Sequence, residues 1–227
     1  MRVAKLWIER FANFNQATRP LEEVVERDPK NREAIAALKD IYGKKRAFKQ
    51  LFDVMKLEAE LASDPEARHQ HRIELARLAG DRLHRPADAI PLWKEVIGHD
   101  PANSEAIDAL EKLAEREKDW PSVAEVIERR IASTGDEKER VKLLSKLGTL
   151  WTDQAPDPKK AVAAWKRVVA IDPRNGRALR TLREGFIAAG DWDGLEGLYA
   201  ETKDWDGLAE VLGNAAERTE DVELKVA

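Results

Sequence analysis

Two stretches of the sequence align without a gap: AIPLWKEVIGHDPAN at 89–103 and AVAAWKRVVAIDPRN at 161–175. They lie 72 residues apart, and both end in the pattern D-P-x-N, which also occurs at 28–31. A further Asp-Pro pair at 64–65 falls midway between the first two copies, so each 72-residue unit divides into two unlike halves of 36 residues. A fixed period of this length indicates a repeat architecture. The 227 residues are therefore expected to hold six to seven short structural repeats.

Each half-repeat is expected to be a hairpin of two antiparallel helices. Apolar residues recur at spacings of three and four, as at Leu143, Leu147 and Leu150, and strong helix formers dominate the same runs. No run of alternating β-branched residues indicates a strand. A break at proline or glycine inside each period, such as 85–86 or 190–191, should separate the two helices. The asparagines that close the D-P-x-N pattern are suited to cap the helix that follows: Asn31, Asn103 and Asn175.

A single hairpin cannot bury its apolar stripe, whereas stacked hairpins bury it continuously. The sequence therefore predicts an all-α fold, a right-handed α-solenoid with one curved inner face, as a single domain over 1–227. The first helix begins incomplete and neither end shows a polar capping helix, so we expect a fragment of a longer repeat array, or ends that another subunit covers. The hairpins are expected at 1–28, 29–64, 65–100, 101–136, 137–172, 173–203 and, incomplete, at 204–227.

Small and aromatic residues recur at fixed places in the repeats. Gly148 and Trp151 in one helix are followed by Ala161, Trp165 and Pro173 in the next. This set resembles the signature of the tetratricopeptide-repeat (TPR) superfamily, here in a 72-residue paired-hairpin form of bacterial type. The resemblance implies that these residues form the structural core of the repeat, together with their counterparts: Trp7, Trp93, Ala89, Pro29 and Pro101.

The composition excludes several classes of protein. The chain has no cysteine, which excludes disulfides, thiolate zinc sites and a cysteine nucleophile. No apolar stretch approaches the roughly 20 residues of a membrane helix. The first ten residues carry charges where a signal peptide needs an apolar core. These features are typical of a cytoplasmic protein.

The residues that could carry catalysis or hold a metal form no convincing group. His69 and His71 are two apart, so on a helix they point to different sides, and His84 and His99 lie near turns. No serine lies in a G-x-S-x-G motif, and no glycine-rich phosphate loop occurs. The aspartates of the D-P-x-N pattern recur in the same turn, which favours a structural role. We therefore expect no enzyme activity, no cofactor and no metal.

The formal net charge of −4 conceals two opposite blocks. Residues 138–183 contain 12 basic and 4 acidic residues, a balance of +8, whereas 184–224 contain 2 basic and 12 acidic residues, a balance of −10. Arginines spaced by three in the first block should stay roughly on one side of a helix. The simplest interpretation is a solvated face with local charge pairing. The alternative is a docking site for an anionic ligand at 159–183 beside one for a cationic ligand at 191–223.

The resemblance to TPR proteins suggests where such a ligand would bind. In that family the first helix of each hairpin lines the inner groove, which implies that Arg177, Arg180 and Glu184 face it. The chain lacks the Lys/Asn/Asn/Lys/Arg clamp by which chaperone-binding members hold a C-terminal carboxylate, so that activity is not expected. The full set of expected partner-binding residues is Arg177, Arg180, Glu184, Lys142, Lys112, Asp108, Arg174 and Lys166.

The sequence predicts a non-enzymatic protein–protein interaction scaffold that binds a peptide or partner protein, of unknown identity, on the concave face of the solenoid. One alternative is a self-assembling structural subunit, a homo-oligomer or part of a larger complex, joined through uncapped ends and opposite charge blocks. A weaker alternative is RNA binding along the basic stripe at 159–183. That stripe lacks interleaved exposed aromatic residues, and the neighbouring acidic block would repel a phosphate backbone.

Overall fold

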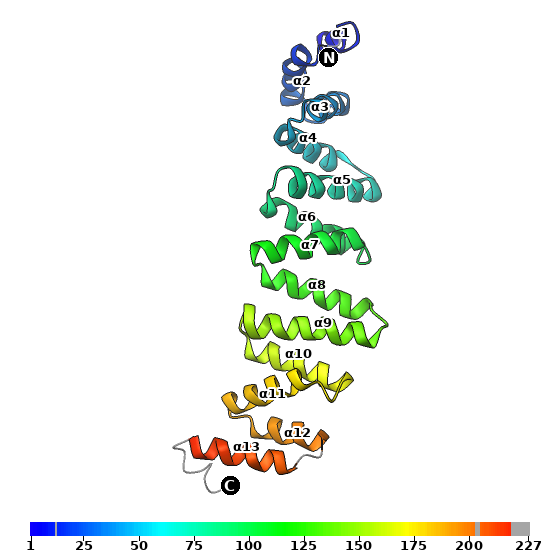
Figure 1. Ribbon diagram of the computed structural model, residues 1–227. Coiled ribbons are helices and arrows are strands. Elements are labelled where there is room, and N and C mark those ends of the chain that lie inside the picture. Colours follow the sequence, from blue (N-terminus) through cyan, green and yellow to red (C-terminus); the bar gives the residue numbers. More distant parts are fainter. Residues whose placement is uncertain (12, 203–204, 219–227) are drawn as a thin grey trace. The chain divides into compact units, whose positions relative to one another are not determined.

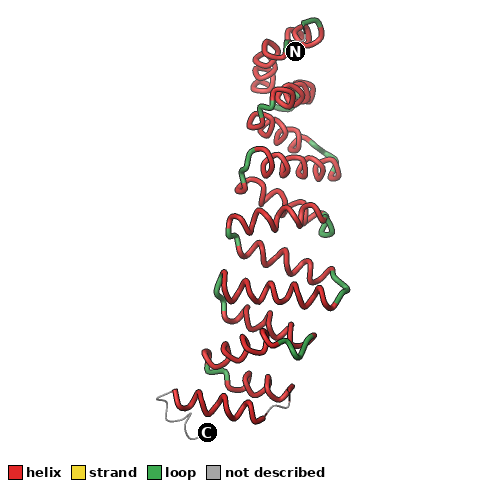
Figure 2. The backbone as a smooth tube through the Cα atoms, in the orientation of Figure 1, coloured by secondary structure: helices red, strands yellow, loops and turns green. Residues whose placement is uncertain are grey.

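The computed structural model describes the chain except for residues 12, 203–204 and 219–227 (Figure 1). The described residues form thirteen α-helices joined by short turns, and no β-strand occurs among them (Figure 2). The prediction of an all-α fold is confirmed. Much of the incomplete hairpin expected at 204–227 lies outside the described residues. The helices group into two compact units, one over Met1–Asp119 and one from Trp120 onward.

In the first unit every α-helix packs on the next one along the chain, so that the unit is built of successive helical hairpins. This is the arrangement that the helical period predicts. The helices are α1 (Arg2–Glu9), α2 (Phe14–Arg27), α3 (Arg32–Lys45), α4 (Phe48–Leu61), α5 (Pro65–Arg77), α6 (Pro86–His99) and α7 (Ser104–Glu117).

The second unit follows the same rule. Its fifth helix is shorter than the others, 11 residues against 14 in the helices on either side, as the local duplication of the Asp-Trp-Asp-Gly-Leu motif at 191–195 and 204–208 would require. The helices are α8 (Trp120–Ser133), α9 (Glu137–Thr149), α10 (Pro158–Ile171), α11 (Gly176–Ala189), α12 (Trp192–Thr202) and α13 (Trp205–Arg218).

The D-P-x-N pattern builds one turn three times. In the first copy the Asp28 carboxylate accepts the backbone N–H of Lys30 at 3.2 Å and the side-chain amide of Asn31 at 3.3 Å. The Asn31 side-chain oxygen then accepts the N–H of Ala34 at 3.1 Å and so caps α3. The predicted capping role of the asparagines is confirmed, because the same bonds recur in the other copies. These copies are formed by Asp100, Asn103 and Ala106, and by Asp172, Asn175 and Ala178.

Two π-helical turns, η1 (Leu78–Arg82) and η2 (Leu150–Gln154), extend α5 and α9. They begin 72 residues apart, and we did not expect them from the sequence. Each turn contacts the helix before its hairpin and the second helix of its own hairpin: η1 contacts α4 and α6, and η2 contacts α8 and α10. The first helix of these two hairpins therefore reaches further than its counterparts and carries additional apolar contacts.

Trp165 and Gly148 account for the close approach of α9 and α10. The Trp165 ring is 1% exposed, and its indole N–H donates to the hydroxyl of Thr152 at 3.1 Å. A Cβ atom on Gly148 would lie 2.5 Å from Cε2 of that ring, so only glycine fits beneath it. Of the other residues expected in the core, Trp93, Ala89 and Ala161 are buried, whereas Trp7 and Trp151 are half-buried.

The prolines of the repeat signature are an exception to the core expectation. Pro29, Pro101 and Pro173 are exposed, so they belong to the turn and not to the packed interior. Each follows the aspartate that ends a second helix, at Asp28 in the first copy. Proline fits there because it has no N–H to leave unsatisfied and cannot continue the helix.

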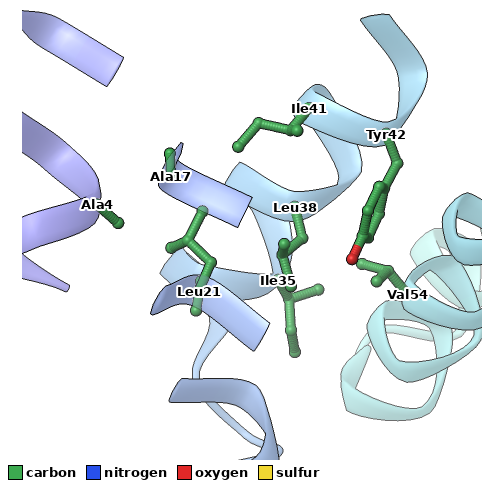
Figure 3. Packing of buried hydrophobic residues seen from close by; sticks show 9 residues of the cluster. Ala4, Ala17, Leu21, Ile35, Leu38, Ile41, Tyr42 and Val54 are labelled. Atoms are coloured by element: carbon green, nitrogen blue, oxygen red, sulfur yellow. The ribbon is translucent and has the colours of Figure 1, made fainter. Parts of the chain in front are cut away.

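The core at the start of the first unit joins residues of three helices in one buried cluster. Ala4 on α1, Ala17 and Leu21 on α2, and Ile41 on α3 are fully buried members of it (Figure 3). The hydroxyl of Tyr42 on α3 donates to the Glu22 carboxylate at 2.5 Å and so links α3 to α2. Burial, together with this carboxylate, raises the pKa of Tyr42.

Candidate partner-binding surface on helix α11

Helix α11 carries the arginines that the sequence singled out. Asn175 caps the helix, and Arg177, Arg180 and Arg183 follow at intervals of three residues. Arg177 and Arg180 are exposed, and Arg183 is partly exposed. Arg174, in the preceding turn, is exposed as well. The helix thus presents a row of cationic side chains, called here the α11 stripe and defined as Arg177, Arg180 and Arg183.

Contacts with neighbouring helices hold only one member of the stripe. The Arg177 guanidinium lies 3.5 Å from the Asp153 carboxylate on η2 and 5.6 Å from the centre of the Trp165 ring. Both contacts come from the hairpin before α11 and orient this side chain. Arg180 and Arg183 have no ion pair with any residue that the structure describes. Two of the three charges in the stripe are therefore available to a ligand.

The same register in the preceding 72-residue unit is acidic. Helix α7 holds Glu105, Asp108 and Glu111 at the positions that correspond to the α11 stripe. Glu105 accepts two bonds from the Arg77 guanidinium of α5, at 2.5 and 2.6 Å. The bonds from Arg77 lower the pKa of Glu105. Asp108 and Glu111 also have partners within the molecule. The acidic row is thus bound internally.

An ion pair between successive first helices occurs twice in the first unit. Lys5 on α1 lies 2.5 Å from Glu33 on α3, and 72 residues later Arg77 pairs with Glu105 in the same way. The third copy of these positions holds Thr149 and Arg177. Thr149 takes the place of the basic residue and Arg177 takes the place of the acidic one, so this ion pair cannot form on α11. The residues at these positions are plain in the sequence, but only the ion pairs of the first two copies show that the positions face each other.

The remaining residues expected to bind a partner are dispersed. Lys142 on α9 is exposed and lies 3.5 Å from Glu139, and Glu184 on α11 is exposed without a partner among the described residues. Lys112 and Asp108 are exposed on α7, in the first unit. Lys166 lies 5.0 Å from the centre of the Phe186 ring, at a shallow cavity of about 280 Å³ between α10, α11 and α12.

Part of the basic block at 138–183 is neutralised locally. Arg167 donates two bonds to Glu128 on α8, at 2.6 and 3.0 Å. Lys160 lies 3.2 Å from Asp157, and bonds from the backbone and side chain of Lys160 lower the pKa of Asp157. For these residues the interpretation as local charge pairing holds. It does not hold for Arg180 and Arg183.

The histidines offer no metal site. His69 is buried and stacks on His99 with ring centres 4.4 Å apart, and His71 lies 3.7 Å from Glu58. No three His, Asp or Glu residues in the described part of the chain are placed to hold a metal together.

Comparison with known proteins places this geometry among solved repeat structures. No protein-family model and no curated protein matches the chain. A chain in the structure of Naa15/Naa10 bound to HypK-THB matches 97% of this chain at 13% identity with a TM-score of 0.53, and the match spans 34% of that longer chain.

Two further matches are tetratricopeptide-repeat proteins. YrrB, a TPR protein with an unusual peptide-binding site, matches 78% of this chain and 87% of its own at 14% identity, with a TM-score of 0.40. A TPR protein from Parabacteroides merdae matches 99% and 97% at 10% identity, with a TM-score of 0.39. Structural neighbours that cover most of the chain are thus TPR proteins, and the sequentially packed helical hairpins are consistent with a TPR α-solenoid. At these identities the likeness concerns the fold alone, so the TPR scaffold does not identify a ligand.

Among the helices that the structure describes, none is both long enough and apolar enough to span a membrane.

Proposed function

We propose that this TPR protein is a non-enzymatic scaffold that binds an acidic segment of a partner protein along the α11 stripe. TPR and other α-solenoid proteins typically act through extended surfaces that contact other proteins. One observation carries the proposal. At the three positions where α7 has acidic residues with partners inside the molecule, α11 has arginines. Two of these arginines have no ion-pair partner among the described residues.

The chemistry of arginine suits an acidic peptide. A guanidinium can donate two parallel bonds to one carboxylate, which gives both strength and a defined orientation. Arg177 is already oriented by Asp153 and Trp165, so less side-chain freedom is lost when it binds. Arg180 and Arg183 supply charge that attracts the ligand. Exposed charges of this kind chiefly raise the association rate and make binding sensitive to salt.

RNA is a poorer candidate for the same stripe. Proteins that bind single strands stack bases on exposed aromatic side chains. Trp165, which contacts Arg177, and Phe186, which lies on α11, are 1% and 2% exposed and cannot offer a face to a base.

We further propose that the protein acts in the cytoplasm, which fits its lack of cysteine.

A direct test measures the binding of a labelled ten-residue polyglutamate peptide by fluorescence anisotropy at low and at about 0.15 M salt. We expect Arg177→Glu with Arg180→Glu to weaken binding by about tenfold or more, because two attractions become repulsions. The matched control is Lys30→Glu with Lys49→Glu, which makes the same change in net charge on exposed residues of the first unit that have no ion pair among the described residues. The control should retain its affinity, and both variants should keep the helical circular dichroism of the parent.

Equal affinity of the parent and the α11 variant at low salt would contradict the proposal. So would equal loss in the two variants, since that result would mean that net charge alone attracts the peptide. Polyuridylate that binds more tightly than the peptide, with the same dependence on Arg177 and Arg180, would favour RNA in its place.

A further inference from the structure

A histidine on helix α5 is buried against a histidine on helix α6. His69 is 4% exposed, and its ring stacks on that of His99, the last residue of α6, with the ring centres 4.4 Å apart and the planes inclined by 24°. The Nδ1 atom of His69 is buried and has no hydrogen-bond partner among the described residues. His99 is exposed. The stack therefore joins one buried and one exposed titratable ring across the α5–α6 hairpin.

The second unit has an apolar pair at the same place. Helices α5 and α6 recur 72 residues later as α9 and α10, which begin and end at the corresponding residues. At this distance His69 corresponds to Val141 and His99 to Ile171. Valine and isoleucine carry no charge at any pH, whereas histidine changes its charge between about pH 5 and 8. The two hairpins thus share a backbone and differ in whether this contact can titrate.

The charged groups on α5 and α6 near the stack already have partners. Arg72, one turn after His69, lies 2.7 Å from Glu95, one turn before His99. Arg68 donates to the carbonyl oxygen of Ala62 at 2.8 Å. Two cationic side chains therefore flank His69 on its own helix, and the carboxylate across from them on α6 is taken by Arg72.

The elements packed against α5 and α6 add no ion pair to the stack. On α4, Glu58 lies 2.6 Å from Lys39 and 3.7 Å from His71, which is two residues from His69. Asp100, directly after α6, accepts bonds from the turn that follows. The other charged residues on these elements are Lys56 and Glu60, which line a hollow with Arg68 and Arg72, Asp81 and Arg82 on η1, and Glu105 on α7, which pairs with Arg77. Among the described residues, none of these carboxylates forms an ion pair with His69 or His99.

This arrangement disfavours two protons on the stack. The position of His99 at the C-terminal end of α6 favours a positive charge there. A second proton, on His69, would place a charge on a buried ring without a partner and would repel the charged His99 ring. The unfolded chain can bind both protons. Stability rises with pH wherever the unfolded state binds more protons than the folded state, so the hairpin loses stability as the pH falls.

We propose that the His69–His99 stack is a pH-sensitive contact that loosens the α5–α6 hairpin as the pH falls from about 7.5 to about 5.5. The α9–α10 hairpin, with Val141 and Ile171, does not respond in this interval. The device belongs to the first unit and is independent of the ligand proposed for the α11 stripe.

Hydrogen exchange of the full chain tests the proposal at pH 7.5 and pH 5.5, with rates corrected for the intrinsic exchange rate at each pH. Both values lie above the range in which most carboxylates titrate. The protection of the amides in α6 should fall by about tenfold, because the unfolded hairpin binds one proton more than the folded one over about one pH unit. The protection of α10 should change by less than about twofold, since its two equivalent residues do not titrate.

His69→Val with His99→Ile, which copies the second unit, should abolish the fall in α6. The matched control is His84→Asn, which removes an exposed histidine of the same unit from a position with φ of 50° that asparagine tolerates. This control should keep the fall. Circular dichroism at pH 7.5 shows whether each variant retains the helix content of the parent.

An equal response of α6 and α10 in the parent would overturn the proposal, and this comparison needs no variant. A fall in the valine–isoleucine variant as large as in the parent would also overturn it, as would the loss of the fall in His84→Asn.

Discussion

Helices α7 and α11 occupy the same place in successive 72-residue units and carry opposite charges. Both are 14 residues long, both are capped by the asparagine of a D-P-x-N turn, and both end at a residue with positive φ. Yet Glu105 on α7 is bound by Arg77, whereas its counterpart Arg177 leads a row of arginines on α11. The shared features hold the backbone, and the positions that differ are exposed. A repeat protein can therefore change a surface completely without changing the scaffold beneath it.

The difference also shows what an exposed charge contributes in each case. On α7 the acids are used inside the molecule, where a half-exposed ion pair adds little to stability. On α11 only Arg177 has an ion-pair partner in the molecule, which is Asp153. Arg180 and Arg183 are therefore available for other contacts. Substitutions in the packing beneath α11, and in the charges of the two helices, test this difference.

The largest effect on stability is expected from removal of the Trp165 ring, which contacts Arg177 of the α11 stripe. Trp165→Ala should lower the free energy of unfolding of the second unit by about 3–5 kcal/mol, because it removes a buried ring and leaves a cavity. Trp93→Ala, at the equivalent and equally buried position of the first unit, should cost a similar amount. Urea denaturation followed by circular dichroism measures both. A neutral Trp165→Ala would mean that the ring is not part of the repeat core.

The space beneath that ring gives a second, smaller effect. Gly148→Ala should cost about 1–3 kcal/mol, since the added Cβ would lie 2.5 Å from the Trp165 ring and must displace it. The reverse change at the equivalent position, Ala76→Gly, should cost about 1–2 kcal/mol, from lower helix propensity and the loss of a buried methyl group. The same denaturation measurement applies. A neutral Gly148→Ala would show that the close approach of the ring is relieved by a small movement.

The missing ion pair on α11 can be restored to neutralise part of the stripe. Thr149→Glu places an acid where the first two copies hold Lys5 and Arg77, opposite Arg177. An exposed pair is worth up to about 1 kcal/mol, so affinity for the polyglutamate peptide should fall by up to about fivefold. Thr149→Gln, which adds a similar volume without charge, is the control. Tighter binding of the peptide by Thr149→Glu would show that the stripe is not the site.

The smallest effect is expected in the pH dependence of stability, and it comes from Glu105 on α7. The bonds from Arg77 hold the pKa of Glu105 below its ordinary value of 4.5, so the folded state keeps this carboxylate charged at pH values where the unfolded chain binds a proton. The stabilisation is therefore present above about pH 4.5 and is lost as the pH falls through the lower folded value.

Denaturation at pH 6 and pH 3 can isolate this contribution. Glu105→Gln should make stability less dependent on pH over that interval than in the parent, by a small amount because the pair is half-exposed. On α11 the same register holds arginines, which do not titrate there, and Arg180 has no ion pair among the described residues, so Arg180→Gln should leave the slope unchanged. An identical slope for Glu105→Gln and the parent would argue that the Arg77 contact contributes nothing in solution.

Much of the fold could be read from the sequence because its causes are local. Asp28 and Asn31 bond to backbone groups two and three residues away, so the turn that they form depends on a few consecutive residues. Proline and glycine marked helix ends for the same reason. The two π-helical turns were missed, because η1 and η2 arise where an extended helix meets both the preceding helix and its own partner, and no local pattern predicts that meeting.

The candidate site was only partly predictable. The arginine spacing indicated the α11 stripe, but Lys142 and Lys166 were grouped with it although Lys142 lies beside Glu139 and Lys166 lies over Phe186. Which charges are paired depends on the distance between side chains of different helices. The exposure of Val3 and Leu6 could not be predicted residue by residue, because both look like ordinary core residues until their exposure is known.

The sequence by itself determined the helical repeat, its turns and the reversal of charge between α7 and α11, because period and charge are properties of the chain. The tertiary structure decided which charges are already paired and which apolar residues remain uncovered. Ion pairs and burial depend on neighbours that are distant in sequence, as Arg77 and Glu105 are. In this protein the contacts between helices decide which charged residues are already paired and which are available to a ligand.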